Sequence, residues 1–297
     1  TEAYQATDNR FYAETAREIF EYVLSSLQSE EGGFYSAEDA DTEGVEGKYY
    51  VWGPQELADI LTEDEYGFFH TLFDLVPAEN VGRAAGTNRT GPMILVLKDT
   101  IRNLAQQKGE PFEQVSSHWD RIRWKLNEMR SRRVRPFKDD KILADWNGLM
   151  IAGLAKGYRI LKEARYKKAA EEAMSFVLSE LLQEDGTLRH MYREGSSAIE
   201  GNLNDYIYIL YALQELFKSS MDPFYLHKAV ELAGTTCELF LDKQNGGFTF
   251  SKVGSDELFT NDKESFDMAI PSGNSMALEV FFTLGRLTGD PGYEEIA

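Results

Sequence analysis

The feature of this sequence that most constrains its fold is an alternation between two kinds of helical segment. Residues 146–161 form a nearly all-apolar stretch, whereas residues 165–182 carry apolar side chains on one face only. A helix that is apolar around most of its girth is buried on most sides, and an amphipathic helix lies at a surface. The two stretches therefore predict an inner helix followed, after a short polar turn, by an outer one.

This inner–outer unit recurs along the chain. Outer helices that open with an aromatic and small residues are expected near Tyr12, Tyr166, Tyr225 and Tyr293, the last three at intervals of about 60 residues. Each complete outer helix is followed by a turn and an extended piece, at residues 31–35, 184–188 and 245–250. Repeated hairpins predict an open array or a closed toroid. The apolar inner helices favour an all-α toroid with short β-hairpins in its loops, because an open array would leave one face of each inner helix in water.

Composition excludes several functional classes. A net charge of −19 argues against a nucleic-acid partner, since the basic cluster at residues 130–135 is only a local patch. Cys237 is the only cysteine, which excludes an intrachain disulfide and a cysteine metal site and fits a cytoplasmic location. No apolar run approaches about 18 residues, so we predict no membrane span.

Polar and aromatic side chains gather where the inner helices begin. These starts are Asp145-Trp146-Asn147-Gly148, residues 200–206 and residues 267–275. In a toroid they open on one face, toward which the acidic loop 38–46 and the extended piece around His190 also lead. Aromatic rings stack on sugar faces, and carboxylate and amide groups pair with hydroxyls. A carbohydrate or small polyol ligand is therefore predicted.

Two sets of candidate site residues follow from this pattern. A carboxylate from the acidic loop facing one from a helix start would suit glycoside hydrolysis, in which one donates a proton and the other activates water. His190 is the histidine to consider as an acid or base, although a structural role suits it as well. The candidate catalytic residues are Asp39, Asp41, Asp145, Asp205 and His190, and the candidate substrate-binding residues are Glu38, Trp146, Asn147, Tyr206, Ser272 and Asn274.

Some of these residues have a structural alternative. Asp145, Asn204 or Asp205, and Ser272 could be N-caps, whose side-chain oxygens accept from the first N–H groups of a helix. We favour the cap for Asn204 and Ser272 and leave Asp145 open. Trp146 could be a plain core residue.

The acidic loop resembles a calcium site only in part. Asp39, Asp41, Glu43 and Gly44 match positions 1, 3, 5 and 6 of an EF-hand loop, but Tyr50 stands where the bidentate Glu is needed. We therefore predict no EF-hand, no metal site and no cofactor. Weak divalent-ion binding by this loop stays open as an alternative.

Four segments together resemble a known family. They are residues 33–52, residues 139–143 with 146–150, Asp205-Tyr206 after Gly201, and residues 271–275. Over essentially its whole length the chain resembles the thioredoxin-domain-containing family typified by spermatogenesis-associated protein 20. The resemblance implies a single domain over residues 1–297, an (α/α)6 toroid similar to six-hairpin glycosidases and N-acylglucosamine 2-epimerases. This toroid would be incomplete at one or both ends, with a thioredoxin-like domain and the first helices upstream.

The resemblance implies a sugar-enzyme-like scaffold, not a particular reaction. Asn202 and Asn204 stand where the family usually has an aromatic and an acid, and Asn261-Asp262 replaces an expected Arg-Pro, which disfavours an acidic sugar. The 2-epimerases use histidines as acid and base, and only His190 is placed for that role here, which argues against epimerase chemistry. We therefore expect a sugar-active or sugar-binding toroid. The alternative is a non-catalytic interaction scaffold for the thioredoxin-like domain.

Overall fold

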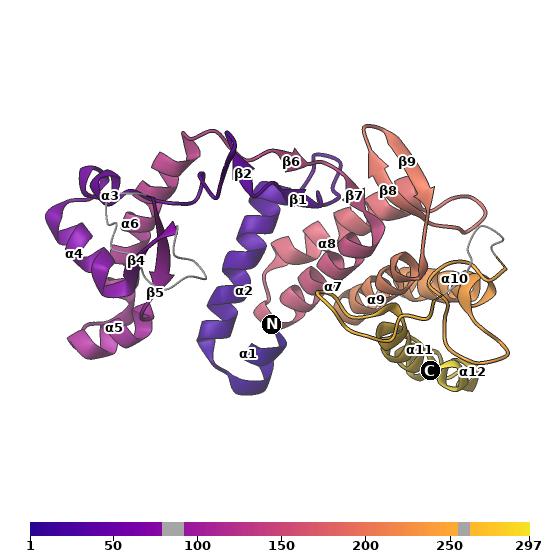
Figure 1. Ribbon diagram of the computed structural model, residues 1–297. Helices are drawn as coiled ribbons and strands as arrows, with labels where there is room; N and C mark the ends of the chain where they lie inside the picture. Colours follow the sequence, from indigo (N-terminus) through magenta and orange to yellow (C-terminus); the bar gives the residue numbers. More distant parts are fainter. Residues whose placement is uncertain (79–91, 255–261) are drawn as a thin grey trace. The chain divides into compact units, whose positions relative to one another are not determined.

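The computed structural model describes residues 1–78, 92–254 and 262–297 (Figure 1). The departure noted at Asn261 lies outside these residues. The chain divides into two compact units: a first unit of Thr1–Ala37 with Asp139–Ala297, and a second unit of Glu38–Lys138. The chain leaves the first unit within β1 (Ala37–Glu38) and returns within β6 (Lys138–Asp139). The single-domain organisation expected from the sequence stays a prediction.

The first unit is built from helical hairpins (Figure 1). The inner helices α7, α9 and α11 lie in a row, with α9 in contact with both of the others, and each outer helix packs against the inner helix before it. The predicted alternation of inner and outer helices in an all-α fold is confirmed. The helices are α1 (Glu2–Thr7), α2 (Arg10–Tyr22), α7 (Ala144–Leu161), α8 (Ala164–Phe176), α9 (Leu203–Ser220), α10 (Pro223–Phe240), α11 (Gly273–Thr288) and α12 (Pro291–Ile296).

Small residues let the inner helices approach closely. A Cβ added to Gly148 of α7 would lie 2.5 Å from the carbonyl carbon of Tyr208 in α9, so the two backbones are in direct contact there. A Cβ on Gly157 would meet the ring of Phe20 from α2 at 2.6 Å. Glycine at these two positions therefore sets how deeply α9 and α2 pack against α7.

The turn from each inner to each outer helix follows one design. Lys162, Met221 and Gly289 each end an inner helix in the left-handed conformation, and the next residue is the N-cap of the outer helix. The N-caps Asp222 and Asp290 each accept a backbone hydrogen bond at 2.9 Å. A left-handed residue stops an α-helix abruptly, so these turns reverse the chain within two or three residues.

Short extended pieces return the chain from each outer helix to the next inner one. They form isolated antiparallel bridges, Gln28 with Phe34, Leu182 with Leu188 and Leu241 with Phe248. A three-stranded antiparallel sheet adds β7 (Ile142–Leu143), β8 (Arg189–Arg193) and β9 (Ser196–Glu200). Pairing of Leu143 with Met191 brings β8 beside the start of α7. These elements confirm the predicted short β-hairpins.

The second unit is smaller and has its own core, centred on Trp52, Phe69 and Ile122. Its strands form two antiparallel hairpins, and none of the described helices of either unit is long and apolar enough to cross a membrane. The elements are β2 (Asp41–Thr42), β3 (Val45–Glu46), α3 (Pro54–Ile60), α4 (Glu63–Leu72), β4 (Phe73–Pro77), β5 (Met93–Leu97), α5 (Ile101–Lys108) and α6 (Phe112–Ser131).

Candidate functional site

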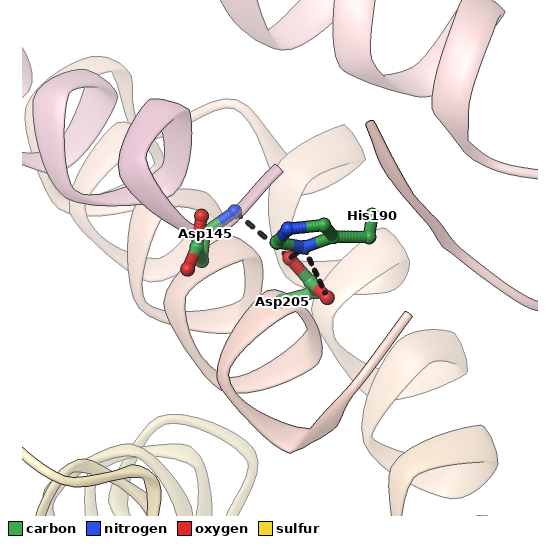
Figure 2. Close-up of side chains that lie close together, drawn as sticks. All are labelled: Asp145, His190 and Asp205. Carbon is green, nitrogen blue, oxygen red and sulfur yellow. Dashed lines mark hydrogen bonds and ion pairs between the residues drawn. The ribbon is translucent and has the colours of Figure 1, made fainter. Parts of the chain in front are cut away.

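Three of the predicted catalytic residues lie together in the first unit. Asp145 belongs to the first turn of α7, His190 to β8 and Asp205 to the first turn of α9 (Figure 2). Each offers a nitrogen or oxygen atom, and these atoms all lie within 4.8 Å of one another. The contact between α7 and α9 brings the two carboxylates together, and the pairing of β7 with β8 adds the imidazole.

Asp205 is the fixed centre of this cluster. Its side chain is completely buried, and it accepts from the backbone N–H groups of Asp145 at 3.1 Å and Asn202 at 2.8 Å. Its Oδ1 and Oδ2 also lie 2.9 and 3.1 Å from Nδ1 of His190. The bond to Asn202 forms part of a capping box that closes the start of α9. Because both oxygens are occupied, Asp205 is suited to hold its neighbours and not to attack a substrate.

His190 is oriented by this carboxylate. An Nδ1–H that donates to Asp205 fixes the tautomer in which Nε2 carries the lone pair of the neutral ring. The hydrogen bond to Asp205 raises the pKa of His190 above its ordinary value, although burial opposes the rise and the charge of Asp145 adds to it. The ring is therefore held in place for proton transfer, and its raised pKa favours the protonated form.

Asp145 is a second group of the cluster with a raised pKa. Burial, together with the negative charge of Asp205, raises the pKa of Asp145 to about 6. Its side chain is 7% exposed, and its Oδ1 accepts from the backbone N–H of Trp146 at 2.7 Å. Leu143, not Asp145, occupies the N-cap position of α7. An acid with a raised pKa beside a histidine is a common arrangement for proton transfer.

A metal ion would find few free ligands in the cluster. Zinc sites in proteins have three or four protein ligands. Both oxygens of Asp205 already accept hydrogen bonds, which leaves the Asp145 carboxylate and Nε2 of His190. The metal-free site expected from the sequence stays a prediction.

The two aromatic candidates have opposite environments. Trp146 is 45% exposed, so it is not a core residue. Tyr206 is completely buried, its ring packs edge-on against Phe240, and its hydroxyl accepts from the N–H of Leu188 at 2.8 Å. The prediction that Tyr206 stacks on a ligand is therefore wrong, because the side chain has no accessible face.

The asparagine candidates are structural as well. The Oδ1 of Asn147 accepts from Phe34 N at 2.7 Å, and its Nδ2 donates to the carbonyls of Phe34 and Leu143. Asn274 binds Phe248 in the same way, with Oδ1 accepting at 2.8 Å and Nδ2 donating at 2.9 Å. These bonds occupy both amides, so neither residue is placed as a hydroxyl ligand. The prediction for both residues is corrected accordingly.

The N-cap alternatives are resolved by the hydrogen bonds. Ser272 is the N-cap of α11, accepts from Ser275 N at 3.1 Å and is 3% exposed. This confirms the favoured cap and leaves Ser272 little surface for a ligand. At α9 the N-cap is Asn202. The sequence-based prediction of Asn204 therefore found the helix start but placed its cap two residues too late.

The remaining candidates, Glu38, Asp39 and Asp41, belong to the second unit. Asp39 and Asp41 are exposed, and Oδ1 of Asp39 accepts from Asp41 N at 3.0 Å, while Oε2 of Glu38 accepts from the hydroxyl of Tyr50 at 3.0 Å. The first unit therefore forms its cluster without them. Their pairing with Asp145 or Asp205 stays a prediction.

Tyr208 is a neighbour of the site that the sequence analysis missed. Its hydroxyl donates to the carbonyl of Pro271, and burial followed by the charges of Asp145, Glu264 and Asp267 raises its pKa to about 12. Tyr208 follows Asp205 by three residues, so the two lie on the same face of α9, and this spacing could have predicted that Tyr208 lies near the site.

The amino-acid sequence of the chain is similar to those of known proteins. No protein-family model matches it. It is 29% identical over 317 aligned residues to spermatogenesis-associated protein 20 of Homo sapiens, a match that covers 97% of this chain. The chain spans about 40% of the length of that relative.

Solved structures with a similar arrangement include a D-mannose isomerase, with a TM-score of 0.48, 14% identity, and coverage of 99% of this chain and 70% of that one. Another is the glycoside hydrolase family 76 mannosidase Bt3792 of Bacteroides thetaiotaomicron, with a TM-score of 0.47, 14% identity, and coverage of 66% and 54%. The motifs at the helix starts and the match over 97% of this chain agree, and they show that the chain is homologous to part of spermatogenesis-associated protein 20.

Proposed function

We propose that the first unit binds a neutral carbohydrate or small polyol at the Asp145–His190–Asp205 cluster and transfers a proton there. The observation that carries the proposal is the bond from His190 Nδ1 to the fully buried Asp205, with the carboxylate of Asp145 beside it. This arrangement supplies a base held in one tautomer and a carboxylic acid that titrates near neutrality.

The roles differ among the three residues. Nε2 of His190 would take a proton from the substrate or return one to it. Asp205 is a positioning residue, since its oxygens hold the imidazole and the start of α7. Asp145 would be the second proton carrier, because its pKa of about 6 lets it hold a proton in weakly acidic solution. The half-exposed indole of Trp146 would stack on a sugar face.

This assignment differs from a paired-carboxylate glycosidase. In such enzymes two carboxyl groups face the glycosidic bond, about 5–9.5 Å apart. Asp205 has no exposed surface and accepts hydrogen bonds through both oxygens, so it does not offer a second carboxylate to a substrate. Proton transfer by a histidine and one carboxylic acid, as in an isomerase or epimerase, fits the described residues better.

Solvent exchange tests the proposal directly. The chain would be incubated in D2O with a panel of reducing monosaccharides and disaccharides, and deuterium entering at the carbon next to the carbonyl would be followed by NMR. We expect exchange with at least one sugar, and His190→Asn should abolish it. His227→Asn, which changes an exposed histidine on α10, is the matched control and should retain it.

The variants also separate binding from chemistry. Trp146→Ala should raise KM with a smaller effect on kcat, because stacking acts on the bound sugar as a whole. Asp145→Asn should lower kcat and remove the pH dependence near 6. The proposal would be rejected if no sugar exchanged, or if His190→Asn exchanged as fast as the wild-type chain.

A further inference from the structure

The second unit has an open cavity at its surface, lined by none of the residues of the cluster in the first unit. Its volume is about 590 Å³, within the range of small-molecule sites. Its walls come from the β2–β3 hairpin, the segment before α3, and the residues that follow α6. The lining residues used below are Lys48, Tyr49, Val51, Arg132, Arg133 and Val134.

Arg133 gives this cavity a rigid wall. Its Nη1 donates to the carbonyls of Tyr49 at 2.7 Å and Val51 at 2.8 Å, and its Nη2 donates to Glu56 at 2.7 Å. The guanidinium also lies 4.2 Å from the ring centroid of Trp52. A cation held by four contacts is fixed in place before any ligand arrives, which lowers the entropy cost of binding.

Two further cations line the cavity and are more exposed. The Lys48 side chain is 48% exposed and pairs with Glu43, and the Arg132 side chain is 65% exposed and pairs with Glu128 on α6. Exposed pairs of this kind are weak, so both cations can turn toward a ligand at little cost.

The charge around the cavity is positive, whereas the net charge of the chain is negative. Three cations and two carboxylates, Glu43 and Glu56, line it, and Glu128 pairs with Arg132 beside it. The guanidiniums of Arg130 and Arg135 lie 5.8 and 5.9 Å from the ring centroid of Tyr49, so five cations and three carboxylates gather here. This local positive surplus occurs in a chain with a net charge of −19. The dipole of α6 favours cations in its last turn. It does not account for Lys48, which lies on another segment, or for Arg133 and Arg135, which follow the helix.

We propose that this cavity binds a small phosphorylated molecule. Arg132 and Lys48 would contact the phosphate beside the fixed guanidinium of Arg133, since arginine forks match phosphate oxygens. The apolar side chains of Val51 and Val134 and the ring of Tyr49 would receive the body of the ligand. The site is separate from the proposed sugar site, because every lining residue belongs to the second unit.

Calorimetric titration of the whole chain tests this site, with phenyl phosphate as the probe and phenol as its uncharged counterpart at equal ionic strength, because neither is a ligand of the proposed sugar site. We expect saturable binding of the phosphate ester. The double variant Lys48→Gln/Arg132→Gln should weaken it by about tenfold or more, because both charge-assisted hydrogen bonds to the phosphate are lost. Arg123→Gln, which alters an arginine within α6 that pairs with Asp120 and does not line the cavity, should bind within about twofold of the wild-type chain.

The variants are chosen so that a loss of phosphate binding can be told from a loss of folding. Arg133 is left unchanged because its contacts hold the unit together, whereas Lys48 and Arg132 are exposed. Circular dichroism should show the double variant folded, and His190→Asn should bind the phosphate ester unchanged even if the sugar site proves inactive. The proposal is overturned if no saturable binding occurs, if phenol binds as well as phenyl phosphate, or if the double variant and Arg123→Gln bind alike.

Discussion

The carboxamide of Asn147 brackets the backbone of Phe34, which lies 113 residues earlier in the chain. Oδ1 accepts from Phe34 N at 2.7 Å and Nδ2 donates to Phe34 O at 3.0 Å. Asn274 brackets Phe248 in the same manner, and the hydroxyl of Tyr206 accepts from Leu188 N. Each of the three inner helices therefore holds the extended piece that follows an outer helix. This connection fixes the helix starts that carry Asp145 and Asp205.

Loss of the Asn147 amide should cost stability before it affects any ligand. Asn147→Ala leaves the buried N–H of Phe34 and two carbonyls without their partner, so we expect the free energy of unfolding to fall by about 2–4 kcal/mol. Urea denaturation followed by circular dichroism measures this change. Asn127→Ala, on the exposed side of α6, is the control and should change it by less than about 0.5 kcal/mol. An Asn147→Ala chain as stable as the control would contradict the structural role.

Gly148→Ala should separate α7 from α9. The added Cβ would lie 2.5 Å from the Tyr208 carbonyl carbon and 2.6 Å from its oxygen, and backbone atoms cannot move aside as a side chain can. We expect a loss of about 3 kcal/mol or more in the free energy of unfolding. Gly153→Ala on the same helix is the matched control, since its nearest neighbour is 4.0 Å away, and it should gain up to about 1 kcal/mol from helix propensity. Equal stabilities for the two variants would show that the helices do not approach this closely.

Asp145 should make the chain less stable as pH rises. Its pKa is about 6 in the folded chain and near 3.8 in an unfolded one, so between these values the folded state binds more protons. Stability contributed by the protonated acid is then lost as pH rises from about 4 to above 6, by about 1–3 kcal/mol. Asp145→Asn removes this loss and should be more stable than wild type at pH 8 but not at pH 3.5. Urea denaturation at both pH values measures the difference, and an equal difference at the two would contradict the raised pKa.

Asp205 should control the titration of His190. Its carboxylate is the main cause of the raised pKa of His190, while burial acts in the opposite direction. Replacement by Asn leaves the burial and removes the charge, so the pKa of His190 should fall. NMR titration of the imidazole protons, assigned by comparison with His190→Asn, measures the change. In the control Glu200→Gln, which alters an exposed carboxylate on β9, the pKa should stay as in wild type. An unchanged pKa in Asp205→Asn would refute the pairing.

The helices and their starts could be predicted from two local features, the spacing of apolar residues along the chain and the residues that cap or end helices. The all-apolar stretch that became α7 and the amphipathic one that became α8 differ in pattern over many residues, so each helix type follows from local sequence. Ser272 was recognised as an N-cap for the same reason, because its partner Ser275 lies three residues away. At α9, Asn202 and Asn204 are both good caps, and local pattern alone does not choose between them.

Local sequence was enough to predict the alternation of inner and outer helices, the polar inner-helix starts, and Asp145, Asp205 and His190 as candidates. The partners and the burial of these side chains come from contacts between distant segments. Asn147, Tyr206 and Asn274 have the chemistry of sugar ligands, but their hydrogen bonds go to backbone groups 113, 18 and 26 residues away. Asp205 became a positioning residue because the contact between α7 and α9 buries it under three donors. The type of a side chain sets what it can bind, whereas its accessible surface and the partners it already has decide what it does bind.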